Sequence, residues 1–101
     1  MNEIMREFLI FGKVQGVGYR RFVKSKAESR HNSPIVGCVE NLKDGSVRVI
    51  ARGDEESLEI LKRYLEVGPI RCQVSRIETR IIQESEWKEK SYSFEHFEII
   101  E

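Results

Sequence analysis

The sequence predicts an α+β sandwich, in which an antiparallel sheet carries two helices packed on one face. Two observations lead to this fold class. Five short segments show the apolar or alternating patterns of strands, and two longer ones show the spacing of amphipathic helices. Their order is strand, helix, strand, strand, helix, strand, strand, which is a split β-α-β pattern. With 101 residues, 40% of them hydrophobic, the chain predicts a single domain spanning 1–101.

The first strand and helix lie on either side of a glycine-rich stretch. The near-continuous apolar run at 5–12 predicts a strand buried on both faces. Residues 21–31 predict a helix, because an apolar stripe runs along one side of it, formed by Phe22, Val23 and Ala27. The turn residues 30–34 follow, and Pro34 prevents the helix from continuing.

A hairpin comes next, with strands at 35–41 and 46–52. The Asp44-Gly45 pair between them is typical of a tight antiparallel turn. The second of these strands alternates clearly. One face of the sheet is expected to receive Val47, Val49 and Ala51, and the opposite face Arg48, Ile50 and Arg52.

The second half supplies another helix and two strands. Asp54 is expected to cap a helix that ends at Gly68-Pro69 and whose inner stripe contains Leu58, Leu61 and Leu65. Strands are predicted at 74–83 and 94–100, and the charged segment 84–91 between them is expected to be mobile. The complete order is that of the ferredoxin-like fold.

The glycine-rich stretch 12–20, with the sequence GKVQGVGYR, is the first candidate site. It connects a buried strand to a helix start, and glycines there let the backbone approach a ligand closely. Successive backbone N–H groups and the helix N-terminus favour an anion, and the Arg20 guanidinium matches phosphate oxygens. From the spacing alone, a plain strand–helix turn is an equally good interpretation.

The second candidate is Asn41, at the end of a predicted strand beside the hairpin turn. Its amide has both a donor and an acceptor, so it can hold a water molecule in a fixed orientation. The other interpretation is a turn residue that caps its own backbone, and this segment alone favours that interpretation.

Together the two stretches resemble the acylphosphatase family, and the resemblance covers nearly the whole chain. The first matches Gly-x-Val-Gln-Gly-Val-x-aromatic-Arg, and the second matches Gly-x-Val-x-Asn-x-x-x-Gly-x-Val from Gly37 to Val47. The resemblance implies hydrolysis of the carboxyl-phosphate anhydride of acyl phosphates, without a metal or organic cofactor. It also implies that Arg20 and Asn41 are catalytic. The implied phosphate cradle is the backbone of Gln15, Gly16, Val17, Gly18 and Tyr19.

Two positions depart from the family's usual pattern. Cys38 stands where an aromatic residue is common, and Glu40 stands where a neutral or basic residue is common. In a strand, Glu40 is expected to point away from Asn41, although its charge could still weaken anion binding at short range.

Two other function classes are alternatives to the enzyme. One is a regulatory or maturation-factor module of the same fold that binds an anion without turnover, and the other is a single-stranded nucleic-acid module. The chain has 17 Lys and Arg against 17 Asp and Glu, whereas a nucleic-acid binder usually has a basic excess. No apolar stretch is long enough for a membrane span and no signal peptide is evident, so we expect a cytoplasmic location without a membrane partner. We also expect a monomer. The resemblance implies acyl phosphates as its partners, and the anion loop implies phosphate or sulfate as competitors.

The spacing of the cysteines and histidines argues against a metal centre. Cys38 and Cys72 are far apart in the sequence, and His31 and His96 have no neighbours at metal-ligand spacing. Two free thiols are expected, although a Cys38–Cys72 bridge remains open without distances.

Overall fold

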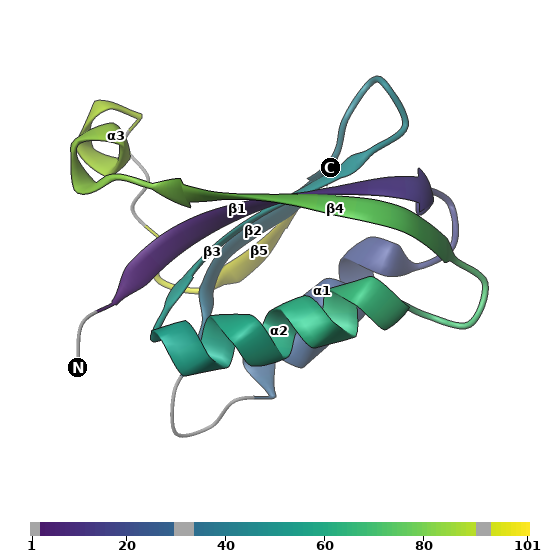
Figure 1. The fold of residues 1–101 in the computed structure, drawn as a ribbon, viewed down its shortest axis with the longest axis horizontal. Helices are drawn as coiled ribbons and strands as arrows, with labels where there is room; N and C mark the ends of the chain where they lie inside the picture. The colour runs from purple at the N-terminus through teal and green to yellow at the C-terminus, as the bar shows by residue number, and fades with distance from the viewer. Residues whose placement is uncertain (1–2, 30–33, 91–93) are drawn as a thin grey trace.

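A computed structural model describes residues 3–29, 34–90 and 94–101. The elements are β1 (Ile4–Lys13), α1 (Tyr19–Glu28), β2 (Val36–Asn41), β3 (Val47–Gly53), α2 (Glu55–Val67), β4 (Gln73–Ile82), α3 (Glu84–Glu89) and β5 (Phe97–Ile100). The five strands form one sheet in the order β4-β1-β3-β2-β5. Helices α1 and α2 lie side by side on one face of this sheet (Figure 1), which confirms the α+β sandwich with a ferredoxin-like arrangement.

The sheet is mixed, which corrects the expectation of a wholly antiparallel one. Strand β3 pairs antiparallel with β1 and β2, and β1 pairs antiparallel with β4. The closing strand β5 instead runs parallel to β2, with Phe97 opposite Gly37. Because the chain must cross from β4 at one edge to β5 at the other, the direction of β5 depends on this long connection rather than on its four residues.

The main core lies between the sheet and the two long helices. Phe8 and Ile10 from β1 meet Val23 from α1 and Leu61 from α2, and all four are fully buried. The alternation predicted for β3 is confirmed, since Val47, Val49 and Ala51 belong to this core while Ile50 lies in a second cluster.

The expectation that β1 is buried on both faces is only partly correct. Its helix side is fully buried at Phe8 and Ile10, but on the other side Leu9 and Phe11 are only half-buried. The guanidinium of Arg76 from β4 covers the Phe11 ring at 4.0 Å, which shields that side with a charged residue rather than with a second apolar layer.

Helix α3 replaces the mobile segment that we expected at 84–91. Its Trp87 packs against the second cluster, formed by Met5, Cys38, Ile50 and Ile82, on the sheet side away from α1 and α2. The Trp87 indole N–H donates to the Ile82 carbonyl at 2.8 Å. These tertiary contacts explain a six-residue helix whose charged sequence gives little sign of it. None of the described helices is long and apolar enough to cross a membrane.

Two local features position the loop between β1 and α1. The pairing of β1 with β4 shifts register between Phe11 and Gly12, and Gly12 has a φ of 130°. A side chain at Gly12 would collide with the Gln73 backbone. Helix α1 begins at Tyr19, two residues before the expected start, and ends at Glu28. Most of the predicted 30–34 turn lies outside the described residues.

Candidate active site

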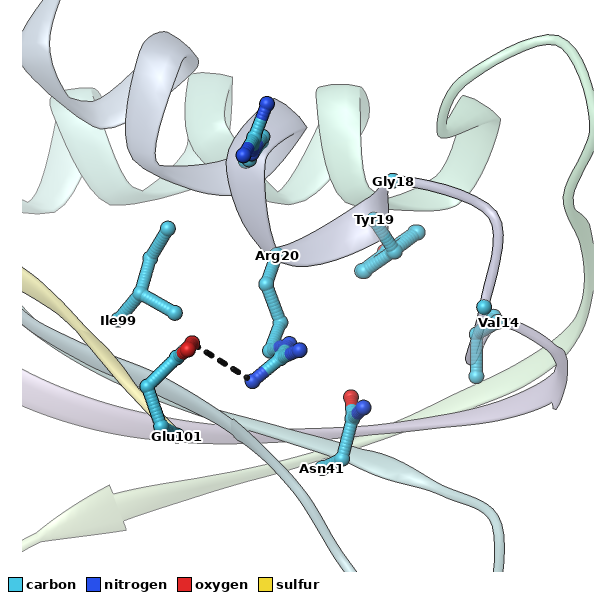
Figure 2. Close-up of a pocket in the computed structure, with 9 residues that line it drawn as sticks. Val14, Gly18, Tyr19, Arg20, Asn41, Ile99 and Glu101 are labelled. Atoms are coloured by element: carbon cyan, nitrogen blue, oxygen red, sulfur yellow. Dashed lines mark hydrogen bonds and ion pairs between the residues drawn. The ribbon is translucent and has the colours of Figure 1, made fainter.

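A cavity of about 240 Å³ opens where the loop after β1 meets the ends of β2 and β5. Its lining residues come from the loop, α1, β2, β5 and the residue after β5: Val14, Gly16, Gly18, Tyr19, Arg20, Arg21, Asn41, Ile99 and Glu101. Figure 2 shows the Arg20 side chain extending between Asn41 and Glu101, with the loop from Val14 to Gly18 beside them. The two stretches singled out in the sequence therefore meet in one cavity.

The loop and the start of α1 together provide a concave set of amide donors. Gly16 and Gly18 have φ values of 73° and 80°, in the left-handed region that favours glycine. Within the described residues, the amides from Gly16 to Arg20 donate to no other protein group. Helix α1 has no acidic residue in its first turn, so no carboxylate of the helix itself offsets the positive end of its dipole. Such a set of donors suits an anion.

Gln15 contributes its side chain in a way that the sequence did not indicate. Its Nε2 donates to the Leu42 carbonyl at 2.8 Å and to the Ser46 carbonyl at 2.9 Å. Both carbonyls belong to the turn that begins directly after Asn41. The side chain thus fastens the glycine loop to the hairpin, and its amide hydrogens are not available to an anion.

The Tyr19 side chain is likewise used within the protein. It is buried, and its hydroxyl donates to the Leu65 carbonyl at 2.7 Å. Burial raises the pKa of the Tyr19 hydroxyl well above its usual range, with a smaller contribution from Cys72. Gly68 has a φ of 67° and leaves space for the ring, because a side chain there would meet both Tyr19 and Cys72. Tyr19 therefore anchors α1 to α2.

Arg20 is the second residue of α1, and its side chain is 32% exposed. Its Nη1 donates to the Ile100 carbonyl at 3.1 Å and lies 3.5 Å from the Glu101 carboxylate. Nothing local in the sequence indicated this contact between the start of α1 and the end of β5. It holds the guanidinium over the cavity.

Asn41 reaches the cavity because of the strand alternation. It shares a face of β2 with Val39, which belongs to the helix-side core, whereas Glu40 faces the other way. There Glu40 lies 3.4 Å from Arg48, which offsets its charge. The hairpin turn is capped by Asp44, whose carboxylate accepts from the Ser46 amide at 2.9 Å. Within the described residues, the exposed Asn41 side chain makes no such capping bond.

Within the described residues, no cysteine or histidine lines the cavity. The described residues hold no group of three or more Cys, His, Asp or Glu that could bind a metal ion. Of the two histidines in the sequence, His31 lies outside the described residues. Cys38 and Cys72 are free thiols, the first buried and the second half-buried. Burial, with the nearby Glu40 charge, raises the pKa of the Cys38 thiol to about 11.

Comparison with known proteins identifies the family. The acylphosphatase family model matches residues 6–99. The chain belongs to the acylphosphatase family. An acylphosphatase of Helicobacter hepaticus is 52% identical over 93% of this chain and 94% of its own.

Solved structures agree with this assignment. An acylphosphatase from Coxiella burnetii superposes with a TM-score of 0.82 at 32% identity, covering 98% of this chain and 94% of that one. A full-length HypF structure matches with a TM-score of 0.78 at 26% identity, but the match covers 99% of this chain and only 12% of HypF. The family, the fold and the acylphosphatase activity expected from the sequence are thereby confirmed, and the family acts on small-molecule acyl phosphates.

Proposed function

We propose that Arg20 and Asn41 carry out the acyl phosphate hydrolysis in this cavity, with distinct roles. The observation that supports this division is that one cavity is lined by the amide-rich loop, by Arg20 from α1 and by Asn41 from β2. A module that only bound an anion would need the loop and Arg20 alone. Asn41, exposed and pointing into the same space, is the group that such a module would not require.

The phosphoryl group binds at the loop. Its oxygens accept hydrogen bonds from the free amides of Gly16 to Tyr19 and from the Arg20 guanidinium. These donors and the N-terminus of α1 stabilise the oxygens as charge redistributes in the transition state. The Asn41 amide holds a water molecule in line with the departing carboxylate. Because a carboxylate is a good leaving group, positioning and electrostatic stabilisation suffice, and neither a metal nor an organic cofactor takes part.

The remaining expectations belong to the same proposal. The chain acts as a single domain over residues 1–101, as a cytoplasmic monomer that uses no nucleic acid or membrane partner. Inorganic phosphate and sulfate compete with substrate, because they present the same oxygens to the same amides and to Arg20.

The test is phosphate release from benzoyl phosphate in excess chelator, comparing the native sequence with Arg20→Ala and Asn41→Ala. We expect turnover in the native protein, loss of both turnover and phosphate affinity in Arg20→Ala, and loss of turnover alone in Asn41→Ala. If Asn41→Ala were less stable but hydrolysed at the native rate per folded molecule, Asn41 would be a turn residue and the proposed mechanism would fail.

A further inference from the structure

We propose that the groove along α1 beside the cavity binds the acyl part of the substrate, and that Arg21 selects acyl groups bearing a second carboxylate. The inference rests on the proposed function and adds a substrate class to it. It concerns a side chain to which the phosphoryl chemistry assigns no role.

The groove continues directly from the phosphoryl cavity. It is broad and open, with a volume of about 540 Å³, and its lining residues are Arg21, Lys24, Ser25, Glu28, Ser29 and Ile99. Arg21 and Ile99 line both the groove and the cavity. A ligand extending out of the cavity past these two residues therefore enters the groove between α1 and the edge strand β5.

The reaction geometry points the acyl group that way. In an in-line displacement the leaving oxygen departs on the side opposite the attacking water. Asn41, which holds the water in our proposal, lines the cavity from β2, while Arg21 lines it from α1. In our proposal the acyl group leaves on the Arg21 side of the cavity, where the groove along α1 begins.

The charges along the groove favour an anionic acyl group. The Lys24 ammonium is already engaged, since it donates to the Phe97 carbonyl at 2.6 Å and lies 3.0 Å from the Glu28 carboxylate. Arg21 is exposed and, within the described residues, has no hydrogen bond or ion pair. The groove therefore presents one uncompensated guanidinium beside the partly buried side chain of Ile99. An acyl group with a second carboxylate on a short or aromatic carbon skeleton matches this arrangement. Its carboxylate can accept hydrogen bonds from the Arg21 guanidinium, and its carbon skeleton can pack against Ile99.

The test compares benzoyl phosphate with 4-carboxybenzoyl phosphate. The two acyl groups differ only in a para carboxylate, which cannot reach its own anhydride to hydrolyse it. We define the preference as kcat/KM for the carboxylated substrate divided by kcat/KM for benzoyl phosphate. Arg21→Gln is expected to lower this preference by about two- to fivefold, the range for an exposed ion pair. High salt should lower it in the native protein and leave the variant nearly unchanged.

The matched control is Lys26→Gln. It removes the same charge from the same helix, but the Lys26 ammonium lies over the Phe22 and Tyr64 rings, at 5.5 and 4.6 Å, and does not line either cavity. Its preference should remain native. An unchanged preference in Arg21→Gln, or an equal loss with both substrates, would overturn the inference. Absence of native turnover with benzoyl phosphate would instead overturn the proposed function itself.

Discussion

Replacing Gln15 with leucine should misalign the two halves of the active site. Leucine cannot donate the bonds that Gln15 Nε2 makes to the Leu42 and Ser46 carbonyls at 2.8 and 2.9 Å. Those bonds join the loop that cradles the phosphoryl group to the hairpin that carries Asn41. Without them, the distance between the bound phosphoryl group and the Asn41-held water is no longer fixed, so the maximal rate should fall.

The magnitude follows from the remaining hydrogen bonds. The Ser46 carbonyl still accepts from the Leu42 amide at 2.9 Å, and the Leu42 carbonyl still accepts from the Gly45 amide at 3.2 Å. Neither carbonyl loses its last partner, so the free energy of unfolding should fall by only about 1–2 kcal/mol. In a domain of this size that lowers Tm by about 4–16 °C. A displacement near 1 Å at the reacting atoms costs up to about 10²-fold in rate, so we expect kcat to fall by about 10- to 100-fold.

A double-mutant cycle separates alignment from general damage. If Gln15 acts through Asn41, Gln15→Leu should lower kcat strongly in the native background and scarcely at all in Asn41→Ala, while the loss of stability should be similar in both. Ser57→Ala is the control, because it removes a part-buried hydroxyl that bonds to Asp54 at 2.9 Å, at the start of α2. It should lower Tm with kcat unchanged. Independent, multiplicative effects of Gln15→Leu and Asn41→Ala on kcat would refute this reasoning.

Four shorter predictions accompany this one. Asn41→Ala should lower kcat by about 10²-fold while inorganic phosphate binds with nearly native affinity, as measured by titration calorimetry. Arg20→Lys should lose at least about tenfold in kcat/KM, because a point charge does not reproduce the guanidinium fork; native activity would contradict its role. Excess chelator should leave turnover unchanged, and restoration of lost activity by a divalent ion would show that a metal is required. Thiol titration should find two thiols after unfolding, whereas in the native protein at pH 8 Cys38 should react slowly, because its pKa is raised to about 11.

The raised pKa of Cys38 also has a consequence for stability. Since the folded state holds the thiol pKa near 11 against an ordinary value of 9.0, folding disfavours the thiolate. The contribution to stability is therefore fully present below pH 9.0 and declines as the pH rises from there toward 11. Cys38→Ala should remove this part of the alkaline loss of stability, which denaturant titrations at pH 8 and pH 10 would measure.

Sequence patterns gave the fold wherever the information was local. The sequence predicted the alternation in β3 and the Asp54 cap because each depends on residues only a few positions apart. The Asp54 carboxylate accepts from the Ser57 amide at 2.8 Å. The direction of β5 and the helix α3 were not, because they depend on a long connection and on Trp87 packing against strands far away in the sequence.

The candidate site divides in the same way. Arg20 and Asn41 stood out because motif spacing and residue chemistry mark them. The Gln15 side chain was overlooked because its two acceptors are backbone carbonyls 27 and 31 residues away, and carbonyls are present at every position. Ile99 and Glu101 were missed for a related reason, since only the pairing of β5 with β2 brings the end of the chain to the cavity.

The contact between Arg20 and β5 explains why a guanidinium suits this position. Only Nη1 is used by the Ile100 carbonyl, at 3.1 Å, and by the Glu101 carboxylate, at 3.5 Å. Within the described residues, Nε and Nη2 donate to no protein group. One arm of the fork can therefore orient the side chain while the other donors bind phosphoryl oxygens. A lysine ammonium has its three donors on one nitrogen and lacks the planar fork. It cannot hold the Ile100 contact with one nitrogen while a second nitrogen binds the phosphoryl oxygens.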